Sequence, residues 1–217
     1  MSAPLFAAAS DAACAALTRL EPGAWGQPSW PAPIAAGFGL LVLDGLLLAR
    51  VRLGDRQGVV EILSTGDLLR PWQREDDLAS IPREHRYDVL ERSRVAVLDI
   101  DFAQRVSGFP PIAAQIVARA IRRSRHFAIN MAIVQQPHVE ARRHMLLWHR
   151  ADRWGTVRAG GALVPVRLTQ TVLGELVAAR RPTVSAAIGV LERDGQLTRM
   201  ASGWLLHGAP PGEHAPG

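Results

Sequence analysis

The chain has one cysteine and no lysine, so all 25 of its basic residues are arginine. The single cysteine, Cys14, excludes a disulfide framework and an iron–sulfur cluster held by several cysteines of one chain. Its alanine-rich surroundings predict a buried and inert thiol. No apolar run approaches the ~18 residues of a transmembrane helix, and no basic segment precedes apolar residues as in a signal peptide. We therefore expect a cytoplasmic protein without a membrane partner.

The sequence also lacks the motifs of catalysis and metal binding. No Ser/His/Asp arrangement stands in a strand–turn–helix context, and no glycine-rich phosphate motif is present. The seven histidines show no compact ligand spacing. His144 and His149 are five residues apart, a spacing that does not place two ligands on one helical face. These absences predict a protein that is not an enzyme and holds no metal ion or other cofactor.

Acidic and basic residues are unevenly distributed along the chain. Residues 1–100 contain 10 arginines and 13 acidic residues, a net charge of −3, whereas residues 101–217 contain 15 and 7, a net charge of +8. A basic second half indicates a polyanionic partner, and a nearly neutral first half fits a sensor joined to it. A membrane surface is the alternative polyanion, but it requires an exposed apolar helix face, and we expect these helices to use their apolar faces for their own cores.

Residues 168–206 have the pattern of two short helices followed by a hairpin. Apolar residues recur at helical spacing in the first part, where Thr169 is a natural N-cap. A second amphipathic helix follows, with Pro182 in its first turn. Strands are expected at 197–199 and 204–206. Two helices and a wing within about 40 residues form an architecture that places one helix in the major groove of double-stranded DNA.

The starts of both helices carry donors suited to DNA. Hydroxyl, amide and guanidinium side chains donate hydrogen bonds to phosphate, and the N-terminus of a helix also favours the negative charge of a phosphate group. A guanidinium at the start of the second helix can bond a guanine edge bidentately, and we expect Arg181 to have this role. The alternative interpretation is a solvated, charged turn in a small helical domain. The candidate DNA-binding residues are Thr169, Gln170, Arg180, Arg181, Thr183 and Ser185.

The first half of the chain has the pattern of an antiparallel β-roll. A helix is expected within residues 1–20, and the proline-rich segment 21–37 predicts a loop or an edge segment rather than a helix. Turns at Asp44-Gly45 and at 54–58 divide the following apolar stretch into short strands. The expected strands are 39–43, 46–53 and 59–63.

Residues 109–136 predict one long helix, which starts near two prolines and ends before Pro137. A helix of about 27 residues spans roughly 40 Å, which is more than one small roll can bury. A parallel coiled-coil homodimer is the economical solution, and packing along the chain's own roll is the alternative. A dimer would also set two recognition helices about one DNA turn, ~34 Å, apart. The candidate dimer-interface residues are Ile112, Ile116, Ala120, Phe127, Met131 and Val134.

The ordered motif LTQ…LGELVAARRPTVSAAIGVLERDGQLTR…GW resembles the C-terminal DNA-binding domain of the Crp/Fnr family of bacterial transcription regulators. The segments LLVLDGLLLARVRLGDRQGVVEILSTGDLL and RSRVAVLDIDFAQRV resemble the family's cyclic-nucleotide-binding β-roll, and LLWHRADRWG resembles the first helix of its tail domain. The resemblance implies an α+β fold with an N-terminal, jelly-roll-like antiparallel β-roll, a long dimerisation helix and a C-terminal winged helix-turn-helix. The implied domains are residues 1–108, 109–137 and 138–217.

The function that this resemblance implies is sequence-specific transcription regulation. A homodimer would bind an inverted-repeat operator in double-stranded DNA, and it would either contact RNA polymerase or block its access. Pro182 and Ala186 stand where familiar members carry an acidic residue and a second arginine, so we expect fewer direct base contacts and a different operator. The alternative function is a ligand-binding sensor that acts through protein contacts and has a vestigial DNA-binding domain.

The ligand pocket of the family is altered in this sequence. Members that bind cyclic AMP carry a Gly-Glu pair soon after a Gly-Asp turn and a later Arg-Ser or Arg-Ala pair. Here Gly66-Asp67 is followed by Leu-Leu-Arg-Pro-Trp, and proline removes an N–H donor where the phosphate cradle should be. Cyclic AMP is therefore not the expected effector. The candidate pocket residues are Arg70, Arg83 and Arg86, for which plain surface charge is the alternative role.

Overall fold

The computed structural model describes residues 3–26, 32–54, 56–71, 81, 83–166 and 168–211. The chain divides into two compact units, residues 1–126 and 127–217. The predicted α+β fold is confirmed. One long helix, α4 (Pro110–Val134), contributes to both units and confirms the long helix that the sequence predicts. Among the described residues, no helix has both the length and the apolar character needed to span a bilayer.

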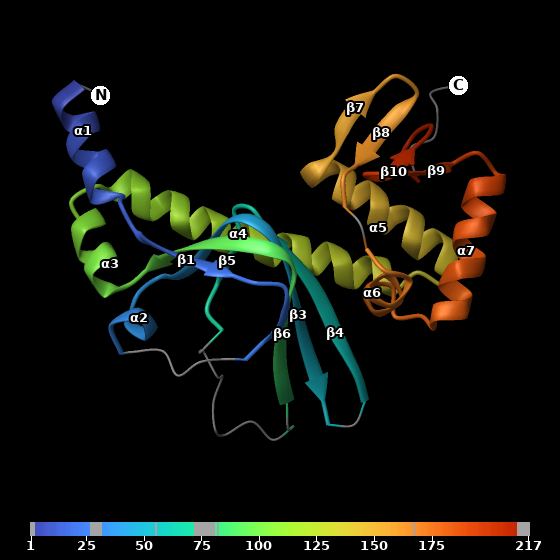
Figure 1. Ribbon diagram of the computed structural model, residues 1–217, viewed down its shortest axis with the longest axis horizontal. Helices are drawn as coiled ribbons and strands as arrows, with labels where there is room; N and C mark the ends of the chain where they lie inside the picture. Colours follow the sequence, from blue (N-terminus) through green and yellow to red (C-terminus); the bar gives the residue numbers. More distant parts are fainter. Residues whose placement is uncertain are drawn as a thin grey trace. The chain divides into compact units, whose positions relative to one another are not determined.

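Unit 1 is built on an antiparallel sheet whose strand order is β1-β6-β3-β4, with β2 also pairing with β6 and β5 with β3. Three short helices gather at one end of this sheet (Figure 1). They are α1 (Ala3–Ala12), α2 (Ala32–Ala36) and α3 (Ile100–Val106), and the strands are β1 (Ala16–Leu20), β2 (Gly23–Trp25), β3 (Gly39–Leu53), β4 (Arg56–Ser64), β5 (Leu68–Leu69) and β6 (Arg83–Leu98).

Two apolar clusters form the core of unit 1. The first lies on the sheet and includes Leu40, Leu47, Leu63 and Val95, each fully buried. The second joins the end of β6 to the helices that follow it, through residues such as Phe102 in α3 and Ile116 in α4. Burial of this apolar area is the main force that holds the helices on the sheet. The members of the second cluster are Ala96, Leu98, Phe102, Val106 and Ile116, with Ile112 packed against them.

The predicted turn at Asp44-Gly45 is wrong, because β3 continues through it as one strand of 15 residues. The partner strand β6 is equally continuous, and the ladder between them passes this point with register shifts on both sides of Asp44. Gly45 has φ +93°, and a Cβ there would lie 2.1 Å from the Ser93 hydroxyl. The Asp-Gly pair therefore forms a β-bulge, in which glycine supplies the positive φ and the close approach.

The N-terminal region also differs from its prediction. The helix α1 ends at Ala12, and residues 16–20 then form β1, which pairs with β6. In segment 21–37 the short strand β2, which pairs with β6, agrees with the expected edge segment, whereas the helix α2 contradicts the expectation of no helix; residues 27–31 lie outside the described part. The expected burial of Cys14 is wrong, because its side chain is exposed.

Unit 2 combines α5 (Val139–Trp154), α6 (Gln170–Leu176) and α7 (Arg181–Arg193) with a small antiparallel sheet (Figure 1). The strand order is β7-β8-β10-β9, and the last two strands form the predicted hairpin. Helix α5 packs against both α7 and β8. The strands are β7 (Thr156–Arg158), β8 (Gly161–Val164), β9 (Leu197–Met200) and β10 (Gly203–Leu206).

Candidate nucleic-acid interface

Helices α6 and α7 form the predicted helix-turn-helix. Thr169 is the N-cap of α6, and its hydroxyl accepts a hydrogen bond from the Val172 N–H at 3.2 Å. After α6 the chain reverses at Ala178, which has φ +51°, and the Ala179 N–H donates to the Gly174 carbonyl at 2.9 Å. This bond returns the chain against α6, so that α7 starts only a few residues after α6 ends.

The close contact at this turn requires glycine at position 174. A Cβ built on Gly174 would lie 2.7 Å from the Ala179 carbonyl oxygen and 3.6 Å from Val184 of α7. Since real Cβ atoms do not approach a backbone oxygen so closely, any side chain here would displace the turn that connects the two helices. Gly174 therefore allows this turn to lie directly against α6.

Helix α7 presents one buried and one exposed face. Val184, Ala187, Ile188 and Leu191 are buried against the rest of unit 2. The predicted DNA-binding residues of this helix and its cap lie towards solvent. Thr169 is exposed as well, whereas the Gln170 side chain is only partly exposed and its Oε1 is buried. The candidates on or next to α7 are the exposed residues Arg180, Arg181, Thr183 and Ser185.

The N-terminus of α7 carries positive charge without a compensating acid. Arg180 is the N-cap, its side chain makes no capping hydrogen bond, and the first turn contains no acidic residue. The partial positive charge of the helix terminus therefore adds to the guanidinium groups of Arg180 and Arg181. Such an arrangement attracts an anion such as a phosphate group.

The outward face of α7 also contains residues that were not among the candidate DNA-binding residues. They are Ala186, Gly189 and Arg193, which follow Pro182 at spacings of four, three and four and, with the predicted Ser185, point away from the buried face. The small side chains among them allow another surface to approach the helix backbone closely. Arg193 extends the positive charge to the last turn of α7. The helical spacing of these residues was the signal from which they could have been found.

Two consecutive arginines of α5 donate hydrogen bonds to backbone carbonyls of the helix-turn-helix. Arg142 donates to the Gln136 carbonyl at 2.6 Å and to the Val177 carbonyl at the end of α6 at 3.1 Å. Arg143 donates to the Val184 carbonyl in α7 at 3.1 Å. Each arginine thus fixes one of the two helices, and neither was predicted, because the partners are carbonyls that have no sequence signature.

Arg143 is a charged residue that is buried in unit 2. Its side chain is fully buried, and its Nε and Nη2 have no hydrogen-bond partner among the described residues. The guanidinium groups of Arg143 and Arg199 both lie over the Trp204 ring, at 5.1 and 5.0 Å. Burial, with a smaller repulsion from Arg199, lowers the pKa of Arg143 to about 9, although Glu192 opposes this shift.

We expect Arg143→Met to stabilise unit 2 by about 1–3 kcal/mol at pH 7, because a buried, incompletely paired charge opposes folding and methionine fills a similar volume. Because folding lowers the pKa of Arg143, the charged form of this side chain destabilises the folded state. The difference in the free energy of unfolding between the variant and the wild type should therefore shrink as the pH rises above about 9. Urea denaturation of both proteins at pH 7 and at about pH 10 measures this difference in the free energy of unfolding. A wild type that is more stable at pH 7 would contradict the prediction.

His144 in α5 should make unit 2 sensitive to acid. It is 8% exposed, and its Nε2 accepts a hydrogen bond from the Trp148 indole at 3.0 Å, which requires an unprotonated nitrogen. Burial lowers the pKa of His144 from 6.5. The unfolded chain therefore takes up the proton first, and stability is lost as the pH falls below about 6.5. Melting temperatures between about pH 7.5 and pH 5 should fall less for His144→Gln than for the wild type, and equal slopes would contradict this.

The predicted pocket arginines are not brought together. Arg70 follows β5 and donates to the Ala35 carbonyl at 2.7 Å. Strand β5 pairs with β3 at Leu40, whereas Arg83 pairs at Leu53, the other end of β3. Arg86 is bonded to Glu84 at 2.6 Å. These three guanidinium groups do not converge as a phosphate site requires.

The predicted dimer-interface residues of α4 fall into two groups. Ile116 is 6% exposed and lies in the core of unit 1, where Ile112 packs against it. The others, Ala120, Phe127, Met131 and Val134, are at least partly exposed. The most exposed apolar side chains of α4 were not among the candidates. They are Val117, Ile121 and Ile129, with exposed fractions of 51%, 49% and 44%.

Comparison with solved structures shows the same fold over most of the chain. FixK2 from Bradyrhizobium japonicum is 16% identical, with a TM-score of 0.66 and coverage of 90% of this chain and 93% of that one. A CRP-family transcriptional regulator from Thermus thermophilus is 18% identical, with a TM-score of 0.61 and coverage of 88% and 92%. The c-di-GMP responsive global regulator CLP of Xanthomonas campestris is 16% identical, with a TM-score of 0.62 and coverage of 96% and 100%.

No family model and no curated protein sequence matches the chain. The structural matches confirm the resemblance to Crp/Fnr regulators at the level of the fold, an N-terminal antiparallel sheet, a long helix and a C-terminal winged helix-turn-helix. The printed descriptions of two of these matched proteins are those of transcription or global regulators.

Proposed function

We propose that the protein is a DNA-binding transcription regulator of the Crp/Fnr type, which acts in the cytoplasm on double-stranded DNA. The observation that carries this proposal is the outward face of α7. It starts with Arg180 and Arg181 at an uncapped helix terminus, contains no acidic residue before Glu192, and is otherwise formed mainly by small side chains. A helix of this kind can enter a major groove, with guanidinium groups for guanine edges and phosphates.

We further propose a homodimer that forms along the α4 stripe, which we define as the exposed or partly exposed face of α4 that contains no charged residue. At 3.6 residues per turn these residues span an arc of roughly 120°, and the four arginines of α4 lie outside it. Solvent exposure of such a stripe is unfavourable, and a second α4 helix would bury it. The stripe consists of Val117, Ala120, Ile121, Ser124, Phe127, Ala128 and Met131.

The sensor role of unit 1 is part of the proposal, but the nature of its effector is not. The separation of Arg70 from Arg83 argues against cyclic AMP. The short, uncharged residues Pro182 and Ala186 favour the alternative of a weak DNA-binding domain in a protein that acts through protein contacts. Both residues are exposed on a cationic helix, and the operator that we propose is therefore one read through few base contacts.

Selection of bound duplexes from a random DNA pool, with the full-length protein, tests the proposed function. We expect an inverted repeat with half-site centres one helical turn, ~34 Å, apart, because a twofold dimer presents two α7 helices. Binding should weaken steeply with salt, since phosphate contacts release counterions. Retention of no duplex even at low salt would overturn the proposal and leave the alternative function. Whether the dimer activates or represses then depends on whether it contacts RNA polymerase or blocks it.

A further inference from the structure

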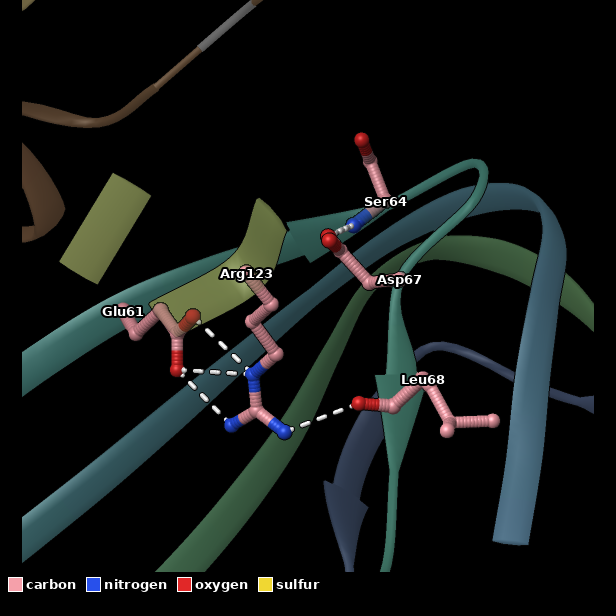
Figure 2. Close-up of polar contacts among 5 residues, drawn as sticks. All are labelled: Glu61, Ser64, Asp67, Leu68 and Arg123. Atoms are coloured by element: carbon pink, nitrogen blue, oxygen red, sulfur yellow. Dashed lines mark hydrogen bonds and ion pairs between the residues drawn. The ribbon is translucent and has the colours of Figure 1, made fainter. Parts of the chain in front are cut away.

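Two arginines of α4, one turn apart, reach from the helix to the sheet of unit 1. Arg119 Nη1 donates to the Gly66 carbonyl at 3.3 Å. Arg123 Nη1 donates to the Leu68 carbonyl at 2.9 Å. The Nε and Nη2 of Arg123 also bind both carboxylate oxygens of Glu61, at 2.8 to 3.3 Å. Figure 2 shows the guanidinium of Arg123 between Glu61 on β4 and the Leu68 carbonyl on β5.

The acceptors of these bonds are held in fixed positions. The turn between β4 and β5 is closed by the Asp67 carboxylate, which accepts from the Ser64 N–H at 2.8 Å (Figure 2). Two backbone bonds tie the same turn to β3, from Gly66 N–H to the Val42 carbonyl at 2.8 Å and from Val42 N–H to the Asp67 carbonyl at 2.9 Å. The Gly66 and Leu68 carbonyls therefore cannot follow α4 if the helix moves.

The Glu61–Arg123 ion pair is largely removed from water. The side chains are 11% and 27% exposed, compared with 42% and 54% for the surface pair Asp44–Arg94. Burial alone would lower the pKa of Arg123, but the hydrogen bonds and charge of Glu61 outweigh it and raise the pKa. If the bonds broke, Glu61 would be left as a buried, unpaired carboxylate, which is costly. Loss of the contact with Glu61 kept in its place is therefore unfavourable.

The two arginines also determine which side of α4 faces away from the sheet. Val117 and Ile121 each precede one of these arginines by two residues, which places them on the opposite side of the helix. Both are about half exposed. With Arg119 and Arg123 bonded to the sheet of unit 1, the α4 stripe points outward.

We propose that Arg119 and Arg123, together with Glu61 and the β4–β5 turn, form a latch that fixes the rotation of α4 on the sheet. The latch keeps the middle of α4 in one register and presents the α4 stripe to a second copy of the chain. The consequence for assembly rests on the proposed homodimer, whereas the docking of α4 within unit 1 does not.

The competing explanation is that the apolar contacts of Ile112 and Ile116 alone hold the helix. These residues belong to the cluster around Phe102, at the start of α4. In that case the arginines would be passive, and their loss would not change the middle of the helix. The two explanations differ in what they predict for residues 117–126.

Hydrogen–deuterium exchange of the full-length protein distinguishes them. Glu61→Gln removes the charge of the acceptor, Arg123→Met removes the donor, and Arg122→Met is the matched control, because Arg122 is the neighbouring exposed arginine of α4. The latch predicts exchange about tenfold faster in residues 117–126 for the first two variants, with β3 and β6 and the Arg122→Met protein unchanged. Wild-type exchange rates at 117–126 in both Glu61→Gln and Arg123→Met would overturn it.

Two further readouts keep the outcome unambiguous. If Arg123→Met also loses protection in β3 and β6, it has unfolded, and the isosteric Glu61→Gln variant decides alone. Sedimentation of Glu61→Gln should show about tenfold weaker self-association than the wild type if α4 rotation serves dimerisation. A monomeric wild type with fast exchange in Glu61→Gln would refute the proposed dimer and leave the latch supported, so that the two failures are distinguishable.

Discussion

Replacement of both Arg180 and Arg181 by alanine is expected to weaken binding to the selected operator at least about 30-fold. Each guanidinium at the start of α7 should contribute about 1–3 kcal/mol through a phosphate or a guanine edge. The single variants should differ in kind. Loss of a base contact relaxes the preference at one operator position, whereas loss of a phosphate contact weakens binding to all duplexes and reduces the salt dependence by about one unit.

Fluorescence anisotropy with the operator and with a scrambled duplex, at several salt concentrations, measures these effects. Arg158→Ala is the matched control, because Arg158 is an exposed arginine of β7 in the same unit and its loss removes the same charge. It should retain nearly the wild-type affinity. If Arg158→Ala weakens binding as much as Arg181→Ala, the effect belongs to overall charge, and α7 is not the recognition helix.

Introduction of glutamate at Ile121 is expected to convert the proposed dimer to a monomer at micromolar concentration. Ile121 lies in the α4 stripe with 49% of its surface exposed in the single chain. The substitution would place carboxylates without partners in an apolar interface, at a cost of several kcal/mol. The dissociation constant should rise at least about 100-fold, and operator binding should fall with it, since one half-site alone binds weakly.

Ile129→Glu is the control for this substitution. Ile129 has a similar exposed fraction, 44%, but lies further along α4 and outside the α4 stripe. Analytical ultracentrifugation of both variants should therefore show a monomer for Ile121→Glu and a dimer for Ile129→Glu. Equal dissociation of the two would show that the interface does not follow the stripe. Unchanged melting temperatures would confirm that both variants fold.

Much of unit 2 and the long helix could be predicted from the sequence, because their signals are local. Pro137 ends a helix whatever lies nearby, and α4 indeed ends at Val134. Thr169 caps α6 through a bond to a residue three positions away. The start of α7 next to Pro182 and its division into two faces follow from residues within about four positions of each other. Such interactions are encoded in one short stretch.

Other features were decided by the tertiary structure, because they depend on residues distant in the chain. The β-bulge at Gly45 forms because the partner strand β6 continues past it. The helix α4 is divided between core and surface because Ile116 packs in the same cluster as Phe102. Arg70 and Arg83 are close in sequence but lie at opposite ends of β3. Arg123 looked like one of several surface charges, yet 62 positions separate it from Glu61, its partner. Periodicity shows which face of a helix is apolar. Only the tertiary packing determines which charged side chains of that helix become buried.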